Sequence, residues 1–235
     1  MAMKVEKVSE LTTNRLSLYL RCLEGLAEAG RLTISSDDLA REFHFNSAQI
    51  RKDLAYFGEF GVRGKGYEVE TLRDNLRSIL GLDKCHKVAL IGAGNLGSAL
   101  VDYYGFHQRN FHITAVFDSD PDKIGQRVKN IEISDMKNFS SVAKRDNIEV
   151  AVIAVPGTAA QSVLEIVSAA GIKAVMNFAP VPLKVSSDVK LNTVDLTTSL
   201  ESLSYFLAQP PRTNGSETLL KSARAQGFTA VKNKR

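Results

Sequence analysis

The stretch that decides the fold is KVALIGAGNLGSAL at residues 87–100, an apolar run that enters a glycine turn and continues into helix-forming residues. Gly92 permits a tight turn, Gly94 lets backbone N–H groups approach a pyrophosphate, and Gly97 lets the helix pack close to the strand. Such a turn presents free amide donors and the positive end of a helix dipole, which hold an anion without a basic side chain. The stretch therefore predicts a dinucleotide-binding strand, turn and helix.

Asp118 ends the next apolar run, where an acidic residue pairs with the ribose hydroxyls of a bound dinucleotide. An acid at this position also repels the 2′-phosphate of NADP, so the pattern favours NAD(H). The alternative is a glycine turn that serves packing alone. The predicted contacts in this part of the chain are Gly92, Ala93, Gly94, Asn95, Leu96, Gly97 and Asp118.

Strands and helices alternate from residue 87 onward, which predicts a mostly parallel sheet covered on both faces. Further strands are expected at 113–118, 149–155, 173–178 and 190–194, and helices near 97–104, 158–170 and 199–207. Two of these strands end in VPGT and NFAP, at the carboxyl edge of the sheet where ligands of such folds bind. This makes candidate cofactor contacts of Val155, Pro156, Thr158 and Asn177, with ordinary strand-to-helix turns as the alternative.

The first 82 residues have another pattern, three helices followed by a glycine-rich hairpin. The first helix is expected to be capped by Thr12 or Thr13 and to end near Gly30, with apolar residues at helical spacing at Leu16, Tyr19, Leu20, Leu23 and Leu26. A second helix follows the cap residue Ser35, and a third spans 47–57 after a short turn. Two short helices around a tight turn predict a helix-turn-helix.

The third helix has a candidate recognition face. Ile50, Leu54 and Phe57 fall on one side, which leaves Ala48, Lys52 and Ala55 facing outward. Small alanines allow close approach to a groove, while basic side chains reach guanine or phosphate and an amide pairs with adenine. The candidate DNA contacts on this helix are Ser47, Gln49, Arg51, Lys52 and Tyr56.

The segment GEFGVRGKGYEVE at residues 58–70 alternates and carries four glycines, which predicts a hairpin wing. Arg63 and Lys65 lie at its tip, where a basic side chain suits a narrow minor groove. The alternative is a solvated hairpin with incidental charges. A short helix at 71–82 is expected to link this part of the chain to the next.

The charge distribution argues against reading DNA binding from the pI of about 9.0. Residues 1–82 carry 12 Lys/Arg and 12 Asp/Glu, residues 83–210 carry 12 and 13, and residues 211–235 carry 6 and 1. The excess lies in the polar tail, 210–235, which is expected to be disordered. Only local clustering of basic residues can therefore argue for DNA.

Cysteine usage and hydropathy exclude several classes of protein. Cys22 and Cys85 are isolated and are predicted to be packed thiols, and four histidines without shared spacing predict no metal site: His44, His86, His107 and His112. No apolar run approaches the roughly 18 residues that span a bilayer, and the N-terminus lacks an apolar secretory signal. A cytoplasmic protein without a membrane partner is expected.

Four leucines give the last helix an apolar stripe at i, i+4, i+7 and i+11: Leu196, Leu200, Leu203 and Leu207. The stripe favours a contact with a second subunit, because helix-turn-helix proteins usually read two half-sites as dimers. Packing on its own domain is the alternative. The expected division is a winged-helix domain (1–82), a Rossmann-like NAD(H)-binding domain (83–195), a dimerisation helix (196–209) and the basic tail (210–235).

Several motifs together resemble the bacterial family of redox-sensing transcriptional repressors called Rex. The resemblance runs along residues 10–209 and is carried by RKDLAYFG (51–58), RGKGY (63–67), GAGNLGSA (92–99), NFAPV (177–181) and VD (194–195). It implies a homodimer that binds operator double-stranded DNA in the absence of NADH, whether or not NAD⁺ is bound. Binding of NADH would close the dimer and release it from the DNA. It also implies a final helix swapped onto the partner subunit.

The same resemblance implies a switch group of Arg21, Tyr103 and Asp195, which rearranges as the nicotinamide changes state. Tyr103 would also contact the cofactor, and Asp195 would form a salt bridge with Arg21 across subunits. The sequence departs from part of the family at Leu196, where some members have a phenylalanine that reaches the partner's nicotinamide site.

Two other functions remain open from the residues. An NAD-dependent dehydrogenase needs an acid or base at the nicotinamide, but no Tyr-x-x-x-Lys occurs and too little chain follows the last predicted strand for a substrate domain. The chain is therefore not expected to be an enzyme. A different nucleotide-responsive regulator is the other alternative, because DSDPDKIG at residues 118–125 is similar to CoA-binding Rossmann domains.

Overall fold

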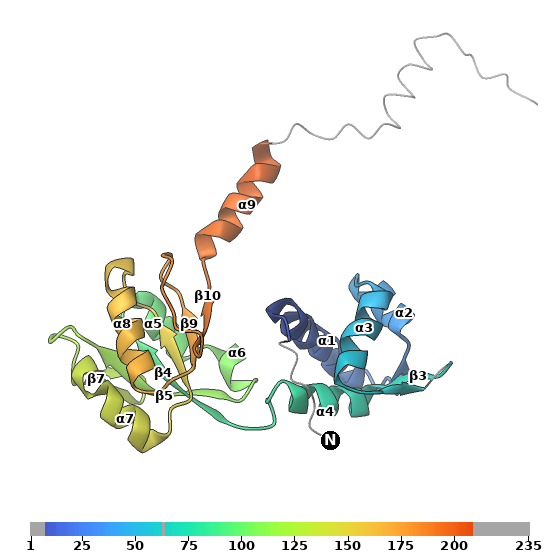
Figure 1. The fold of residues 1–235 in the computed structure, drawn as a ribbon, viewed down its shortest axis with the longest axis horizontal. Coiled ribbons are helices and arrows are strands. Elements are labelled where there is room, and N and C mark those ends of the chain that lie inside the picture. Colours follow the sequence, from blue (N-terminus) through green and yellow to red (C-terminus); the bar gives the residue numbers. More distant parts are fainter. Residues whose placement is uncertain (1–7, 63, 209–235) are drawn as a thin grey trace, which may run out of the picture.

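The computed structural model describes residues 8–62 and 64–208, which fold into two units joined through one linker (Figure 1). The N-terminal unit contains α1 (Glu10–Glu28), β1 (Thr33–Ile34), α2 (Ser36–Phe43), α3 (Ser47–Phe57), β2 (Gly61–Val62), β3 (Gly66–Glu68) and α4 (Val69–Ile79). The five apolar residues predicted on the inner face of α1 are its buried residues. The cap differs from the prediction, because Ser9 accepts the Thr12 N–H and α1 begins one turn earlier than expected.

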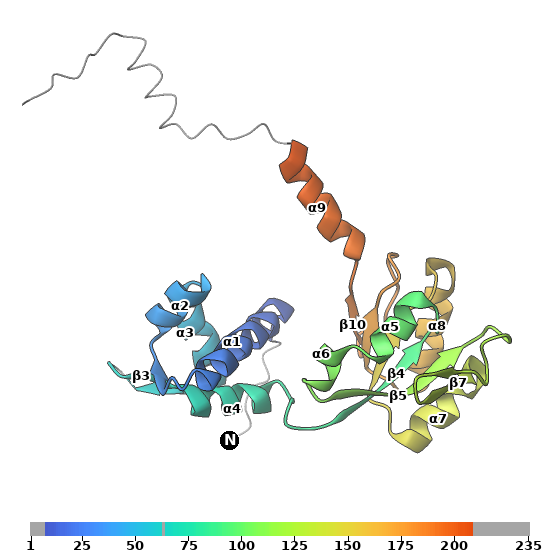
Figure 2. The ribbon, with the colours of Figure 1, turned by 180° about the vertical axis from the view of Figure 1, so that it is seen from behind.

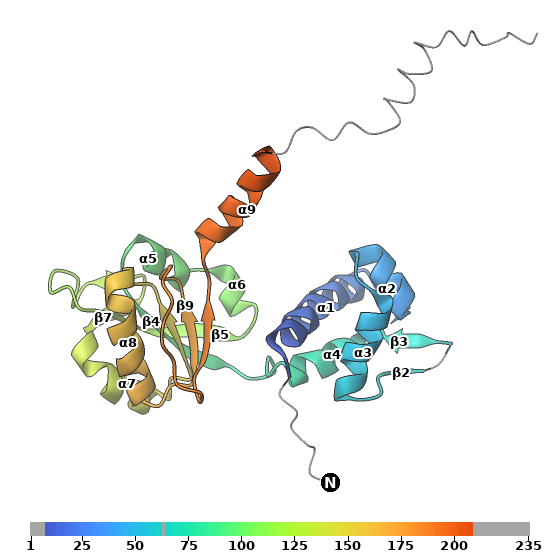
Figure 3. The same cartoon turned by 45° about the horizontal axis from the view of Figure 1, so that its top comes forward.

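The helix-turn-helix and the wing form as predicted (Figure 3). Ser35 caps α2, and the side chain of Asn46 caps α3 by accepting the Gln49 N–H at 3.0 Å. Strands β2 and β3 pair as an antiparallel hairpin, and β1 adds a third strand that the sequence did not predict. Gly66 has a φ of +84°, and a Cβ there would meet the Ile34 carbonyl oxygen at 2.5 Å, so glycine is required where the hairpin crosses β1.

The second unit is a seven-stranded sheet of order β10-β9-β8-β4-β5-β7-β6, whose neighbours are parallel except β6 and β7 (Figure 2). Its elements are β4 (His86–Ile91), α5 (Asn95–Val101), α6 (Tyr104–His107), β5 (Phe111–Asp118), β6 (Arg127–Val128), β7 (Ile131–Asp135), a 3-10 turn (Met136–Asn138), α7 (Phe139–Asp146), β8 (Val150–Ile153), α8 (Gly157–Ala169), β9 (Ala174–Asn177) and β10 (Lys190–Thr193). The predicted winged helix followed by a mostly parallel α/β unit is confirmed.

Each face of this sheet has its own apolar core. Helices α7 and α8 cover one face through residues such as Phe139 and Leu164, whereas α5 and α6 cover the other through Val101 and Phe106. The sequence predicted neither β7 nor α7. The sheet therefore reaches further beyond β5 than the sequence indicated.

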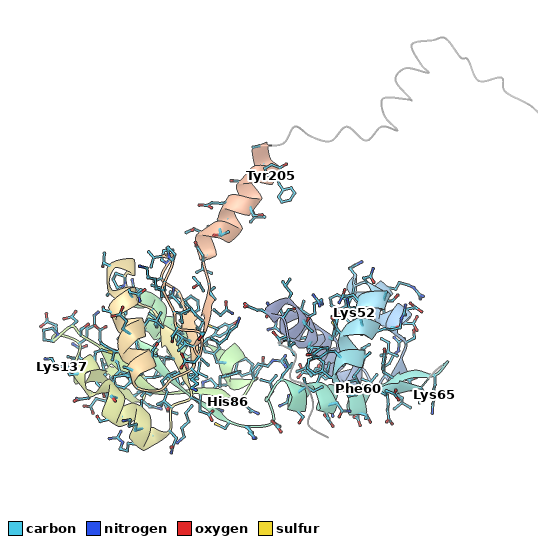
Figure 4. All side chains as sticks on the ribbon, viewed as in Figure 1. Lys52, Phe60, Lys65, His86, Lys137 and Tyr205 are labelled. Atoms are coloured by element: carbon cyan, nitrogen blue, oxygen red, sulfur yellow. The ribbon has the colours of Figure 1, made fainter. Side chains whose placement is uncertain are left out.

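The last helix, α9 (Leu196–Ala208), extends away from both units (Figure 1). Its leucine stripe is exposed, with 60% of Leu196, 67% of Leu200, 59% of Leu203 and 87% of Leu207 accessible. Packing of this stripe on its own domain, the alternative raised by the sequence, does not occur. Figure 4 shows Tyr205 on the same exposed helix.

Two further predictions can be placed. Cys22 is half-buried, but Cys85 is exposed in the linker before β4, so the expectation of a packed thiol is wrong for Cys85. The tail at 210–235 and Arg63 lie outside the described residues. None of the helices within 8–62 and 64–208 is long and apolar enough to cross a bilayer.

Candidate nucleotide and DNA-contact sites

The glycine turn lies between β4 and α5, at the carboxyl edge of the parallel sheet. Gly92 has a φ of +101°, and a Cβ on it would lie 2.4 Å from the Ala154 carbonyl oxygen. A Cβ on Gly97 would lie 1.9 Å from the Gly92 carbonyl oxygen, so only glycine lets α5 approach the turn this closely. Gly94 faces open space, with no atom within 4 Å of its Cβ position. The turn is therefore an open cradle of the size and donor type that suit a pyrophosphate.

Asp118 ends β5 beside this turn and is tied to it. Its carboxylate accepts hydrogen bonds from the N–H of Ala93 at 2.8 Å and of Asp120 at 3.0 Å, and Lys123 Nζ lies 3.2 Å away. Burial alone raises the pKa of Asp118, but these two N–H donors and Lys123 outweigh it and hold the pKa below its usual value. An ionised carboxylate offers about four lone-pair positions, so room remains for a ribose hydroxyl.

Lys123 is a feature that sequence reasoning did not place here. Its ammonium group lies 3.2 Å from Asp118 Oδ2 and 3.5 Å from Asp120 Oδ2. The spacing of Asp118, Asp120 and Lys123 directly after a predicted strand could have indicated this contact. Both acids hold the cation beside the position expected for the adenosine ribose.

The other predicted edge residues divide into two groups. Val155 packs against the glycine turn, since its Cγ1 would lie 3.0 Å from a Cβ on Gly92, and Pro156 and Thr158 are exposed at the start of α8. Asn177 instead is fully buried, and its amide donates to the Ala179 carbonyl at 2.9 Å and accepts the Ala179 N–H at 3.0 Å. Its amide group holds the turn after β9, and its contact with a cofactor stays a prediction.

The three residues of the expected switch group are not all together within one chain. Arg21 and Tyr103 line the same cavity of about 460 Å³ between α1, α6 and the sheet. Asp195 accepts hydrogen bonds from the Thr197 N–H and hydroxyl at 2.9 and 2.6 Å, which cap α9 and lower the pKa of Asp195. No ion pair joins Asp195 to Arg21 within the described chain.

The candidate recognition helix presents an exposed face with Lys52 at its centre. Ala48, Lys52 and Ala55 are exposed as predicted, whereas Ile50 and Leu54 are buried. Figure 4 shows Lys52 on α3 and Lys65 on the hairpin, both in the N-terminal unit. Tyr56 is 44% exposed at the end of the same helix, where its ring meets that of Phe57 edge-on.

Three of the predicted contacts have partners inside the unit. Arg51 donates to the hydroxyl of Ser36 at 2.7 Å and to the carboxylate of Asp37 at 3.3 Å. Ser47 starts α3 and also bonds Asp37, which lowers the pKa of that acid. The amide of Gln49 donates to Asp53 at 2.7 Å, so pairing with adenine would require Gln49 to leave this carboxylate.

Asp53 was not singled out from the sequence, yet it anchors α3 on α1. Its side chain is 3% exposed and accepts from Arg15 Nε at 2.6 Å, Arg15 Nη2 at 2.8 Å and the hydroxyl of Tyr19 at 3.0 Å. Burial raises the pKa of Asp53, but the hydrogen bonds from Arg15, Gln49 and Tyr19 outweigh it and lower the pKa. Burial and the same carboxylate raise the pKa of Tyr19 to about 12.

A DNA-reading unit joined to a nucleotide-type α/β unit defines the class of ligand-responsive transcription regulators. Two family models agree with this division of the chain. One described as "Putative DNA-binding protein N-terminus" matches residues 7–55, and one described as "CoA binding domain" matches residues 83–181.

Curated relatives match nearly the whole length of the chain. The redox-sensing transcriptional repressor Rex of Carboxydothermus hydrogenoformans is 46% identical over 86% of this chain and 98% of the relative. That of Syntrophomonas wolfei is 48% identical over 88% and 98%, and Rex 1 of Thermotoga maritima is 43% identical over 87% and 98%. The chain belongs to the Rex family of redox-sensing transcriptional repressors.

Solved structures of a Rex-family repressor called RSP have the same fold. Its complex with beta-NAD+ and operator DNA superposes with a TM-score of 0.82 at 38% identity, covering 96% of this chain and all of RSP. Its complex with beta-NADH superposes with a TM-score of 0.77 at 36% identity, covering 93% and 99%.

Proposed function

We propose that this protein is a homodimeric repressor whose affinity for operator DNA reports the NADH/NAD⁺ ratio, with NADH binding lowering that affinity. The carrying observation is the open glycine cradle beside an ionised Asp118, in a chain whose N-terminal unit presents an exposed recognition helix. RSP, a family member of the same fold, has been crystallised with both nicotinamide forms and with operator DNA.

The nucleotide would lie along the carboxyl edge of the sheet. Backbone amides of residues 92–97 would hold the pyrophosphate, and Asp118 would accept from the ribose hydroxyls. Val155, Pro156 and Thr158 would border the site, and Tyr103 would contact the nicotinamide end. NAD⁺ and NADH act here as regulatory ligands, so the proposal requires no catalytic residue and describes no enzyme.

The DNA-facing surface would combine α3 with the wing. Lys52 would reach bases or phosphates in the major groove, with Ser47, Gln49, Arg51 and Tyr56 around it, and Arg63 and Lys65 would enter the minor groove. A regulator of this kind works where the operator is, which in a bacterium is the cytoplasm. We divide the chain into the DNA-reading domain (1–82), the NAD(H) domain (83–195), the dimerisation helix (196–209) and the tail (210–235).

The dimer would be built by α9. Its four leucines are left exposed by residues 8–62 and 64–208. The cavity beside Arg21 and Tyr103 has a partly apolar lining that includes Phe106, Val152 and Met176. An α9 from a second copy would cover both and bring its Asp195 toward Arg21. At Leu196 the chain departs from the relatives that have a phenylalanine there, so the packing around the nicotinamide would differ from theirs.

Titration of NADH into a complex with operator DNA tests the proposal. Duplex DNA selected from a random-sequence pool in the absence of NADH serves as the probe, at fixed salt because phosphate contacts make affinity salt-dependent. We expect NADH to release the DNA and NAD⁺ to release it far less. Unchanged affinity at saturating NADH contradicts redox sensing even where NADH binds.

Regulation by CoA is a second candidate, favoured by the match of the CoA-binding model to residues 83–181. Calorimetry with NADH, NADPH and CoA separates the two, and we expect NADH to bind tightest. Turnover of an alcohol or hydroxy acid with NAD⁺ would instead favour a dehydrogenase.

A further inference from the structure

The two units meet at an ion pair between α1 and the segment after α6. Arg109 Nη1 donates to Glu24 Oε1 at 2.7 Å, and Arg109 Nη2 lies 2.7 Å from Glu24 Oε2, so the contact is bidentate. Both side chains are only about a quarter exposed, at 23% and 24%. Arg77 of α4 joins the same carboxylate at 3.3 Å.

Neighbouring hydrogen bonds make this contact part of a polar joint. The Leu82 carbonyl in the linker accepts from Asn110 Nδ2 at 2.7 Å and from Arg77 Nη2 at 3.3 Å. The Asn110 carbonyl in turn accepts the N–H of His86, the first residue of β4, at 2.7 Å. Both units and the linker are thus connected through groups next to Arg109.

Arg109 is also connected to the nucleotide side of the sheet. Tyr103 directly precedes the four-residue helix α6. Its carbonyl accepts the N–H of Phe106, and the Phe106 carbonyl accepts the N–H of Arg109, both at 3.0 Å. Tyr103 and Arg109 line the same cavity of about 460 Å³, while Glu24, Arg77 and Arg109 border a second cavity of about 580 Å³. Tyr103 and Arg109 are therefore joined through Phe106 by two backbone hydrogen bonds, and a cavity borders the joint on each side.

We propose that Arg109 is a positioning residue of the redox switch, which carries a change at Tyr103 to Glu24 and so sets how the DNA-reading unit is held. The inference rests on the proposed function. As part of this proposal we assign the Arg109–Glu24 ion pair to the operator-binding arrangement. The chain superposes on the operator complex of RSP with a TM-score of 0.82 over 96% of its residues, and on the NADH complex with 0.77 over 93%. A second ion pair between the units, Glu10 with Lys190, is more exposed and should contribute less to holding the units together.

Thermodynamic linkage between NADH binding and operator binding distinguishes a residue of the switch from a residue that only stabilises the fold. Loss of the ion pair destabilises the operator-binding arrangement relative to the NADH-binding one, so less NADH is needed to release DNA. A variant that simply folds poorly binds both ligands less well. Tighter apparent NADH binding together with unchanged or weaker operator binding therefore identifies a shifted equilibrium.

The test compares Arg109→Ala, Glu24→Ala and the double variant of the full chain with Arg73→Ala. Arg73 borders the same cavity as Glu24 but pairs with Asp74 on its own helix, so it controls for loss of a local charge. The readouts are the NADH concentration that releases half of the operator DNA and the NADH affinity of the free protein. We expect that concentration to fall about tenfold in each single variant, within the usual range of allosteric coupling. The double variant should match the singles, because both residues act through one contact.

Half-release at the parental NADH concentration in both single variants overturns the proposal, as does a shift to higher NADH. A shift of equal size in Arg73→Ala also overturns it, since charge alone then explains the effect. Failure of the parent to release DNA with NADH is a separate outcome, which contradicts the proposed function itself.

Discussion

The carboxylate of Asp118 accepts the N–H of Ala93 at 2.8 Å, which fixes the end of β5 against the glycine turn that follows β4. The hydrogen bonds from the N–H groups of Asp120 and Ala93 both lower the pKa of Asp118. They keep this acid ionised beside the proposed ribose position. Lys123 shares the same carboxylate. One side chain therefore shapes the turn, holds Lys123 and lies where we propose that the ribose binds.

Replacement of Asp118 by alanine should weaken NADH binding and narrow the preference over NADPH. Loss of a hydrogen bond to a charged group costs roughly 1.5–3 kcal/mol, about tenfold or more in affinity. The change also removes one of the two acids that hold Lys123, leaving a cation free for a 2′-phosphate. Calorimetry with NADH and NADPH measures the ratio of their affinities. Asp188→Ala is the control, because Asp188 is an exposed acid elsewhere on the chain. An unchanged NADPH/NADH ratio contradicts the assigned role of Asp118.

Replacement of Lys52 by alanine should lower operator affinity by roughly 1–3 kcal/mol if it reads a base, and should reduce the salt slope by about one if it binds a phosphate. Arg63→Ala should also weaken binding. Lys137→Ala is the matched control, because Lys137 is 89% exposed and lies on the other unit (Figure 4). Parental affinity of both test variants at equal salt would mean that another surface reads the DNA.

Stability should depend on pH through Asp53. Its pKa is lower in the folded state, so its contribution is present above the unfolded value of about 3.9 and is lost as the pH falls through the folded value. Asp53→Asn should lower the free energy of unfolding by about 2 kcal/mol at pH 7. This is less than for a fully buried ion pair, because Arg15 is 31% exposed and solvent screens the interaction. The variant should also lose less stability than the parent on acidification from pH 7. Urea unfolding at several pH values measures both effects, with Asp122→Asn as a surface control; parallel pH curves for parent and Asp53→Asn would refute the role.

Replacement of Leu203 by glutamate should disrupt the proposed dimer. The side chain is 59% exposed in a single chain, so the change should leave the fold intact while placing a charge in the subunit interface. Light scattering after size exclusion measures the mass, with Glu201→Gln on the same helix as the control. Monomers for Leu203→Glu alone are expected, and dimers in both variants would place the interface elsewhere.

Much of the fold was predictable because its signals are local. Helical spacing identified the five buried apolar residues of α1, and the glycines predicted the turn after β4. The sequence missed β7 and α7, since five and eight residues carry too short a pattern and their place depends on pairing with β5 and packing on the sheet. Cys85 was expected to be packed because hydropathy does not reveal that it lies in an exposed linker.

By itself the sequence determined the two kinds of unit, the glycine cradle and the acid beside it, because each depends on neighbours a few residues apart. Only the tertiary structure decided which distant groups meet. Asp53 and Arg15 are 38 residues apart, and Arg109 and Glu24 are 85 apart. Such pairs form because packing of distant segments buries charged groups, and a buried charge without a partner is costly. Local sequence patterns do not show which distant segments pack together.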